Sequence, residues 1–212
     1  MAGYEILTPD CKNLDDVCLT YDPRGQEIRL DLGCGYYKKA GFIGLDNFVG
    51  AESQIKTNRG PDIRIDLSEE AIPFSDDSVI EIFTSHFLEH VPMDRLLKEI
   101  YRVLAPTGAI QIVLPYANSA AGMYPGHIGF YTEQWFEQNE LFNTLFSVYR
   151  LAWRKTPLYD QLPIGLTQTL PFHLARRTMF NICDEFMIFA IPKKRTDVNY
   201  ASLQAETLIY SA

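Results

Sequence analysis

Five short apolar segments, bounded by Gly, Pro, Asp or Ser, follow one another between residues 28 and 114. Their length and their β-branched and aromatic content predict strands at 28–32, 42–45, 63–67, 79–83 and 110–114. Helical spacing of apolar residues over 96–104 predicts one amphipathic helix before the last strand, with a stop at Pro106-Thr107-Gly108. Apolar strands with intervening helix predict an α/β fold, a mainly parallel sheet with helices on both faces.

The second half of the chain is less regular and rich in aromatic side chains. Its apolar spacing predicts a helix over 133–146 and strands at 146–151 and 185–191, which we expect to pair as an antiparallel hairpin across the excursion 153–181. We divide the chain into an N-terminal extension, a main domain whose residues 116–180 shape the substrate side, and a tail. The bounds of these three parts are 1–27, 28–194 and 195–212.

Composition limits the class of protein. With 212 residues, 47% of them hydrophobic, one domain with a sizeable core is expected. No apolar run approaches the roughly 18 residues that cross a bilayer, and the first residues lack the features of a secretory signal, so we expect neither a membrane protein nor a secreted one. Cys11, Cys18, Cys34 and Cys183 show no spacing typical of zinc or disulfide scaffolds, which favours a cytoplasmic location and no metal.

The net charge of the chain bears on the kind of molecule that it binds. Lys and Arg total 19 against 27 Asp and Glu, a formal net charge of −8. Binding of nucleic acid depends on clustered cations, and the two basic clusters, at 176–177 and 193–195, are short. The balance therefore favours a small-molecule partner over a nucleic acid.

Chemistry-bearing residues stand where the first three predicted strands end. The first strand runs into Asp31-Leu32-Gly33-Cys34-Gly35, the second ends at Asp46-Asn47, and the third ends at Asp66-Leu67. Glycines at a strand end allow a sharp turn and close approach of a ligand, and an acid at the second strand can accept hydrogen bonds from a ribose diol. Each Asp alone is more typical of a loop cap, but three successive strands that end in a GxG turn, an Asp and an Asp together predict a nucleotide-type cofactor site.

These residues resemble the class I S-adenosylmethionine-dependent methyltransferases, in a type 11-like form. The resemblance covers about residues 28–115 in the family's order, through the segments 30–35, 44–46, 66–67, 73–78, 88–91 and 102–108. It implies a Rossmann-like, seven-stranded sheet whose last strand, at 185–191, is antiparallel. It also implies S-adenosylmethionine as the cofactor.

Carried over position by position, the resemblance implies a role for each strand end. Asp31 and the turn Gly33, Cys34 and Gly35 would lie against the methionine portion of the cofactor. Asp46, with Asn47 beside it, would hold the ribose, and Asp66 and Leu67 would flank the adenine. Ser85 and His86, just past the fourth strand, would line the side nearest the sulfonium.

One departure from the family pattern concerns the first crossover. Only ten residues separate Gly35 from Asp46, whereas the family places a full helix there and parallel crossovers need a dozen or more residues. Either the crossover is unusually tight or the strand assignment is wrong. The chain resembles a shortened subgroup of the family.

Three rival interpretations remain beside the methyltransferase. His86-Phe87-Leu88-Glu89-His90 matches the H-x-x-E-H zinc pattern of inverzincin proteases, although Pro92 argues against the long helix that such ligands need. A nicotinamide oxidoreductase would need a third glycine where Lys38 stands and a longer gap to its acid. A catalytically silent methyltransferase-like domain that binds a protein is the main alternative, because the shortened turn could abolish cofactor binding.

The acceptor side gives one catalytic candidate. Methyl transfer needs alignment and, for a hydroxyl or protonated amine, a base, for which histidine suits neutral pH. His127, about a dozen residues past the fifth strand, is our candidate base or substrate contact, with a helix cap near Thr132 as the alternative. The predicted function is S-adenosylmethionine-dependent methyl transfer to a small-molecule or sugar-containing acceptor.

Overall fold

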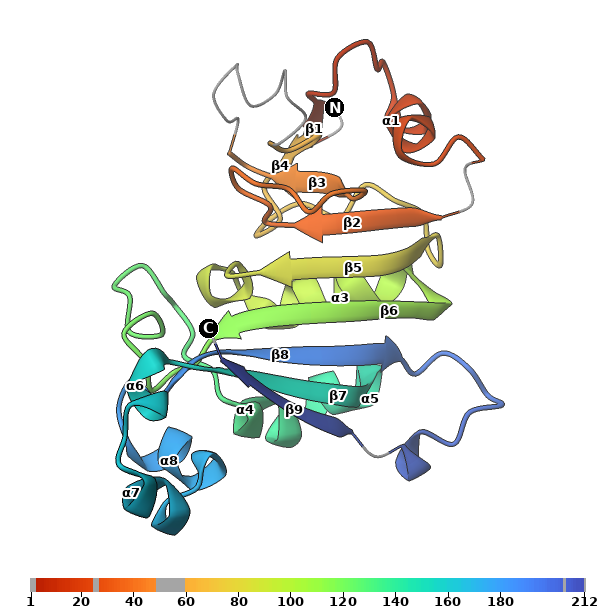
Figure 1. The fold of residues 1–212 in the computed structure, drawn as a ribbon. Coiled ribbons are helices and arrows are strands. Elements are labelled where there is room, and N and C mark those ends of the chain that lie inside the picture. The colour runs from red at the N-terminus through yellow and green to blue at the C-terminus, as the bar shows by residue number, and fades with distance from the viewer. Residues whose placement is uncertain (1–2, 25–26, 49–59, 204, 212) are drawn as a thin grey trace.

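The computed structural model describes residues 3–24, 27–48, 60–203 and 205–211, and across these residues nine strands form one mixed sheet (Figure 1). Residues 1–2 and 25–26 of the expected extension, and residues 204 and 212 of the expected tail, lie outside the described residues. The order in the sheet is β1-β4-β3-β2-β5-β6-β8-β7-β9. The strands are β1 (Tyr4–Ile6), β2 (Ile28–Leu32), β3 (Ile43–Asp46), β4 (Ile63–Ile65), β5 (Val79–Ser85), β6 (Leu104–Pro115), β7 (Phe146–Lys155), β8 (Cys183–Pro192) and β9 (Glu206–Ser211).

The predicted mainly parallel, Rossmann-like sheet is confirmed. Strands β4, β3, β2, β5 and β6 pair in parallel, and β8 runs antiparallel between β6 and β7. The expected hairpin partners are therefore neighbours. Seven strands were expected and the sheet has more, because β1 pairs antiparallel with β4 at one edge and β9 pairs parallel with β7 at the other.

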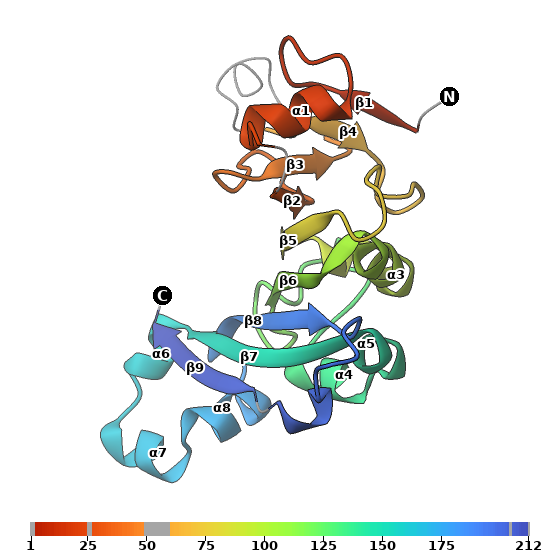
Figure 2. The ribbon, with the colours of Figure 1, turned by 90° about the vertical axis from the view of Figure 1, so that its right-hand side faces the viewer.

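The described helices differ in length and in their place along the sheet. They are α1 (Leu14–Tyr21), α3 (Met93–Val103), α4 (Glu133–Gln138), α5 (Glu140–Leu145), α6 (Pro157–Asp160), α7 (Ile164–Thr169) and α8 (Phe172–Thr178), with the 3-10 turns η1 (Leu88–His90) and η2 (Tyr200–Ser202). Figure 2 shows α3 beside β5 and β6 and α5 at one end of β7, whereas α6, α7 and α8 are grouped beyond the other end of β7. None of the described helices is long and apolar enough to cross a membrane.

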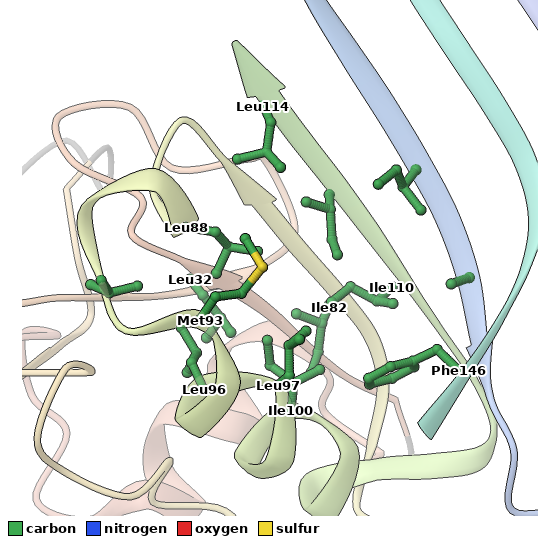
Figure 3. Packing of buried hydrophobic residues seen from close by; sticks show 14 of the residues in the cluster. Leu32, Ile82, Leu88, Met93, Leu96, Leu97, Ile100, Ile110, Leu114 and Phe146 are labelled. Atoms are coloured by element: carbon green, nitrogen blue, oxygen red, sulfur yellow. The ribbon is translucent and has the colours of Figure 1, made fainter. Parts of the chain in front are cut away.

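Helix α3 covers the centre of the sheet, as its apolar spacing predicts. Leu96, Leu97 and Ile100 are almost fully buried and point toward the strands that carry Ile82 and Ile110 (Figure 3). Burial of such side chains stabilises each by about 1.5–3 kcal/mol relative to exposure. The helix ends at Val103, before 106–108 as predicted, and these residues belong to β6, where the pairing with β5 shifts register.

The predicted helix over 133–146 is two helices. Asn139 separates α4 from α5, and its side chain accepts a hydrogen bond from the Phe142 backbone amide at 2.7 Å, an N-cap that begins α5. The excursion between β7 and β8 forms α6, α7 and α8.

The tight crossover is the correct alternative, since β2 and β3 pair in parallel as neighbouring strands. Residues 33–42, all of them described, contain no helix and instead make two turns closed by the amides of Tyr37 and Phe42. The crossover also covers part of the sheet face opposite α3. The ammonium of Lys39 lies 4.4 Å and 4.3 Å from the ring centroids of Phe42 and Phe83.

A buried ion pair anchors this crossover at the amino ends of β3 and β4. The Lys38 ammonium lies 2.7 Å from the Asp62 carboxylate, and both side chains are 2% exposed. Asp62 also accepts hydrogen bonds from the Gly44 amide at 2.7 Å, the Tyr21 hydroxyl at 2.7 Å and the Thr8 hydroxyl at 3.0 Å. Because Tyr21 ends α1 and Thr8 follows β1, the carboxylate joins the N-terminal segment to the crossover.

We predict that Lys38→Met lowers the free energy of unfolding by about 3–5 kcal/mol, because it leaves a buried carboxylate without its countercharge. Urea denaturation followed by circular dichroism measures the change. Lys98→Met, the same substitution at an exposed position of α3, is the matched control and should leave the midpoint near that of the wild type. Equal effects of the two substitutions would contradict a structural role of the pair.

Candidate functional site

The glycine turn after β2 has the backbone geometry that its sequence predicts. Gly33 and Gly35 have φ of 69° and 53°, which side-chain-bearing residues rarely adopt. A Cβ added to Gly33 would lie 2.0 Å from Cγ of Phe87, so the Phe87 ring packs directly on this glycine. A Cβ added to Gly35 would meet nothing within 4 Å. The turn is therefore closed by Phe87 at its first glycine and open at its second.

Asp46 is tied to that turn. One carboxylate oxygen accepts a hydrogen bond from the Gly35 amide at 2.8 Å, and the other accepts one from the Phe48 amide at 2.8 Å. Two backbone donors thus fix the orientation of the carboxylate at the end of β3. Asn47, the next residue, is exposed.

The third strand end lies beside the second. Asp46, Asn47, Asp66 and Leu67 line one cavity of about 390 Å³, together with Phe87 and His90 from the segment after β5. Leu67 is buried and gives the cavity an apolar wall. The exposed Asp66 accepts hydrogen bonds from the amide and hydroxyl of Ser68 at 2.9 Å and 2.5 Å, which lower the pKa of its carboxyl. The sheet thus brings together four residues that the sequence placed on two separate strand ends.

Asp31, on β2, and Cys34, within the turn, are both buried. The Asp31 carboxylate accepts a hydrogen bond from the Lys39 amide at 2.7 Å, so it orders the crossover from below. Burial raises the pKa of Asp31 to about 6, although the Lys39 amide and the nearby lysine charges partly offset the effect. Burial also raises the pKa of the Cys34 thiol well above its usual range, so this cysteine is an inert packing residue.

Ser85 and His86 stand at the end of β5, the strand next to β2. His86 has φ of 52°, and its Nε2 lies 3.0 Å from a carboxylate oxygen of Glu185 on β8. Glu185 is also 3.1 Å from the Arg154 guanidinium and accepts a hydrogen bond from the Tyr210 hydroxyl at 3.3 Å. The hydrogen bond to Glu185 is the main cause that raises the pKa of His86. The imidazole is held in place and is 42% exposed.

His127 occupies a different position from the other predicted residues. Its side chain is only 6% exposed, and its Nδ1 lies 3.0 Å from the Gly122 carbonyl oxygen. Its Nε2 faces Glu89, at 3.8 Å from a carboxylate oxygen. This burial leaves little surface for contact with an acceptor, and the catalytic role of His127 stays a prediction.

The segment 86–90 is not the long helix that an inverzincin site would need. It consists of a turn at His86 followed by the short 3-10 turn η1, and His86 is engaged by Glu185. Two residues that sequence reasoning missed, Phe87 and Glu185, contact predicted ones. Phe87 could have been found as the neighbour of His86 past a strand end, whereas Glu185 is brought to the site only by the insertion of β8 beside β6.

Comparison with known proteins agrees with this geometry. Residues 30–112 match the sequence profile of a methyltransferase domain family. No curated protein matches the chain in sequence.

Solved structures extend the likeness of the methyltransferase domain to most of the chain. An S-adenosylmethionine-dependent methyltransferase from Archaeoglobus fulgidus is 16% identical, with 84% of this chain and 92% of that chain covered and a TM-score of 0.53. A Haloferax volcanii chain from a complex with the methyltransferase activator Trm112 is 15% identical, with 87% and 93% covered and a TM-score of 0.53. A Thermotoga maritima methyltransferase is 17% identical, with 79% and 82% covered and a TM-score of 0.50. At these identities the likeness establishes the class I methyltransferase fold.

We predict that Asp31 makes the stability of the domain fall as pH rises from about 4 to about 6. Its folded pKa, about 6, lies above the value of about 3.9 for an unfolded aspartate, so the folded state binds the extra proton in this window. The free energy of unfolding should therefore decline by up to about 3 kcal/mol and then level off. Urea titrations at several pH values measure it.

Asp31→Asn is the test variant, because it keeps the shape and the acceptor of the hydrogen bond but cannot ionise. The difference between wild type and Asp31→Asn should shrink or change sign as pH rises through the window. Asp10→Asn, at an exposed turn, should follow the wild-type curve. Parallel curves for wild type and Asp31→Asn would contradict the prediction.

Proposed function

We propose that the protein is an S-adenosylmethionine-dependent methyltransferase that acts on a small-molecule or sugar-containing acceptor. The observation that carries the proposal is the hydrogen bond between the Gly35 amide and Asp46, which joins two strand ends beside a cavity of about 390 Å³. In parallel α/β sheets, ligands bind beyond the carboxyl ends of the strands. In this sheet the parallel strands β2, β5 and β6 point the same way, so their carboxyl ends lie together (Figure 1).

The residues present suit this cofactor. Each Asp46 oxygen already accepts one backbone hydrogen bond, and a carboxylate oxygen can accept a second, so the pair of oxygens suits the two ribose hydroxyls. Leu67 and Phe87 offer apolar surface to a base, and the open space at Gly35 admits a ligand close to the backbone. The buried Asp31 lies under the same turn, where an ammonium group of the ligand would favour its ionised form.

The reaction needs few groups from the protein. When bound, the cofactor would supply an electrophilic methyl group on its sulfonium; a lone pair of the acceptor would bond to the methyl carbon, and the C–S electron pair would leave with sulfur as a neutral thioether. The His86 imidazole is placed to take the proton that an acceptor hydroxyl or ammonium releases, because it is half-exposed at the end of β5 and Glu185 fixes its ring. Glu185 in turn is held by Arg154 and Tyr210.

The loop after β6 supports a small acceptor with apolar surface. It carries four large side chains that are 58–65% exposed, Met123, Tyr124, Ile128 and Phe130. The net charge of −8 disfavours a nucleic acid as acceptor. An exposed apolar loop at the strand ends suits an acceptor whose ring or chain can be desolvated there.

We predict micromolar binding of S-adenosylmethionine and of S-adenosylhomocysteine, measured by titration calorimetry, and no binding of NADH. Asp46→Ala should weaken binding by about 10-fold or more, because two charge-assisted hydrogen bonds are lost. Asp197→Ala, at an exposed acid of the C-terminal segment, is the control and should bind like the wild type. Absence of binding to either sulfur ligand would overturn the proposal.

We predict that the protein transfers a radiolabelled methyl group from S-adenosylmethionine to a component of a small-molecule extract. His86→Ala should lower the rate by about 100-fold or more and leave the dissociation constant of the cofactor little changed. His173→Ala, at an exposed position of α8, is the control. Cofactor binding without transfer to any extract would favour the silent, protein-binding alternative, and an unaffected rate in His86→Ala would rule out His86 as the proton acceptor.

A further inference from the structure

Three side chains at the edge of the cavity form a cluster that methyl transfer does not use. Glu89 and His90 lie on η1 and His127 lies in the loop between β6 and α4, and each offers one ligand atom within 4.8 Å of the others. We propose that Glu89, His90 and His127 bind a divalent transition-metal ion of the zinc class. This site borders the proposed cofactor cavity, which His90 also lines, but the proposal does not depend on the proposed function.

The Glu89 carboxylate is buried without a hydrogen bond from any described residue. Its side chain is 1% exposed, and neither oxygen has a hydrogen-bond partner among the residues that the structure describes. The imidazoles of His86 and His127 approach one oxygen only to 3.7 Å and 3.8 Å. A buried carboxylate without hydrogen bonds is costly, whereas coordination of a metal ion satisfies it.

The two histidines are oriented as metal ligands usually are. His90 Nδ1 lies 3.1 Å from the Gly126 carbonyl oxygen, and His127 Nδ1 lies 3.0 Å from the Gly122 carbonyl oxygen. A carbonyl accepts only from an N–H, so in both neutral rings Nδ1 carries the proton and Nε2 keeps its lone pair. Metal-binding histidines typically donate their second ring N–H to a backbone carbonyl or carboxylate in this way.

The backbone holds the distant ligand in place. The amides of Ile128 and Gly129 donate to the Glu89 carbonyl oxygen at 2.8 Å and 3.2 Å. His127 therefore stands next to Glu89 through main-chain hydrogen bonds, although 38 residues separate them. The rings of His90 and His127 are edge-to-face with centroids 4.7 Å apart.

The ligand set selects the ion. Two imidazole nitrogens and one carboxylate oxygen suit Zn²⁺, Co²⁺ or Fe²⁺ and disfavour Mg²⁺ and Ca²⁺, which prefer oxygen. Ligands at 2.0–2.1 Å around a tetrahedral ion lie about 3.4 Å apart. The ligand atoms, now up to 4.8 Å apart, therefore have to approach one another by up to about 1.4 Å, and the exposed His90 has more room to move than the buried Glu89. Three protein ligands leave a fourth position open, and because His90 also lines the cavity, that position lies at the cavity edge.

The test uses the full chain, stripped with a chelator and titrated with Zn²⁺ by calorimetry, with Co²⁺ as a spectroscopic probe. We expect one ion per chain and tetrahedral Co²⁺ absorption bands. His90→Ala, at an exposed position, and the isosteric Glu89→Gln should each lower the affinity by about 100-fold or more. His173→Ala removes a histidine elsewhere and should bind like the wild type. Circular dichroism of the metal-free variants checks that they are folded.

The outcomes are separable. Loss of binding in His90→Ala and Glu89→Gln but not in His173→Ala supports the site. Wild-type protein that binds no Zn²⁺ tightly, or variants that all bind alike, would overturn it. Asp46→Ala should still bind Zn²⁺, so failure of the cofactor proposal and failure of the metal proposal give different results. A Zn²⁺-dependent rise in the thermal midpoint of wild type, absent from His90→Ala, is a second readout.

Discussion

The buried contact between Lys38 and Asp62 holds the cofactor half of the sheet together. A parallel crossover without a helix has little apolar surface of its own with which to pack. Here the ion pair of Lys38 and Asp62, with both side chains 2% exposed, fixes the crossover instead. The Asp62 carboxylate also accepts hydrogen bonds from Tyr21, Thr8 and the Gly44 amide. The register of β3 and the position of the glycine turn follow from it, because the crossover joins them directly.

Several acidic side chains lie near the carboxyl ends of the parallel strands, and each has different partners. Asp46 is oriented by backbone amides, Asp31 is buried beneath the turn, and Glu185 is paired with His86 and Arg154. Glu89 has no side-chain hydrogen bond among the described residues, and the imidazoles of His86 and His127 approach one of its oxygens to 3.7 Å and 3.8 Å. The acids of this region therefore stand in several distinct chemical environments.

The sequence predicted the parallel strands and the order of the site residues because burial and strand ends leave local signals. Asp31, Gly33 and Asp46 each follow an apolar run, and the sheet then brings them together. Helix α1 also has a local signal, because Asn13 and the apolar residues of 14–21 at helical spacing are typical of a capped helix. The edge strand β1, with three residues, is too short for periodicity. The contacts of Glu89 with His127 and of Glu185 with His86 depend on how distant segments fold, and no local pattern encodes them.

The order of the strands has a consequence for how the chain reaches its folded state. Strand β1 is made first but pairs with β4, which ends at Ile65, and β8 lies between β6 and β7 although it follows both in the chain. During synthesis β1 therefore stays unpaired until β4 emerges, and β6 and β7 stay apart until β8 emerges. Closure of these long loops sets the pace of folding, and the unpaired edges of β6 and β7 are exposed to misassociation in the meantime.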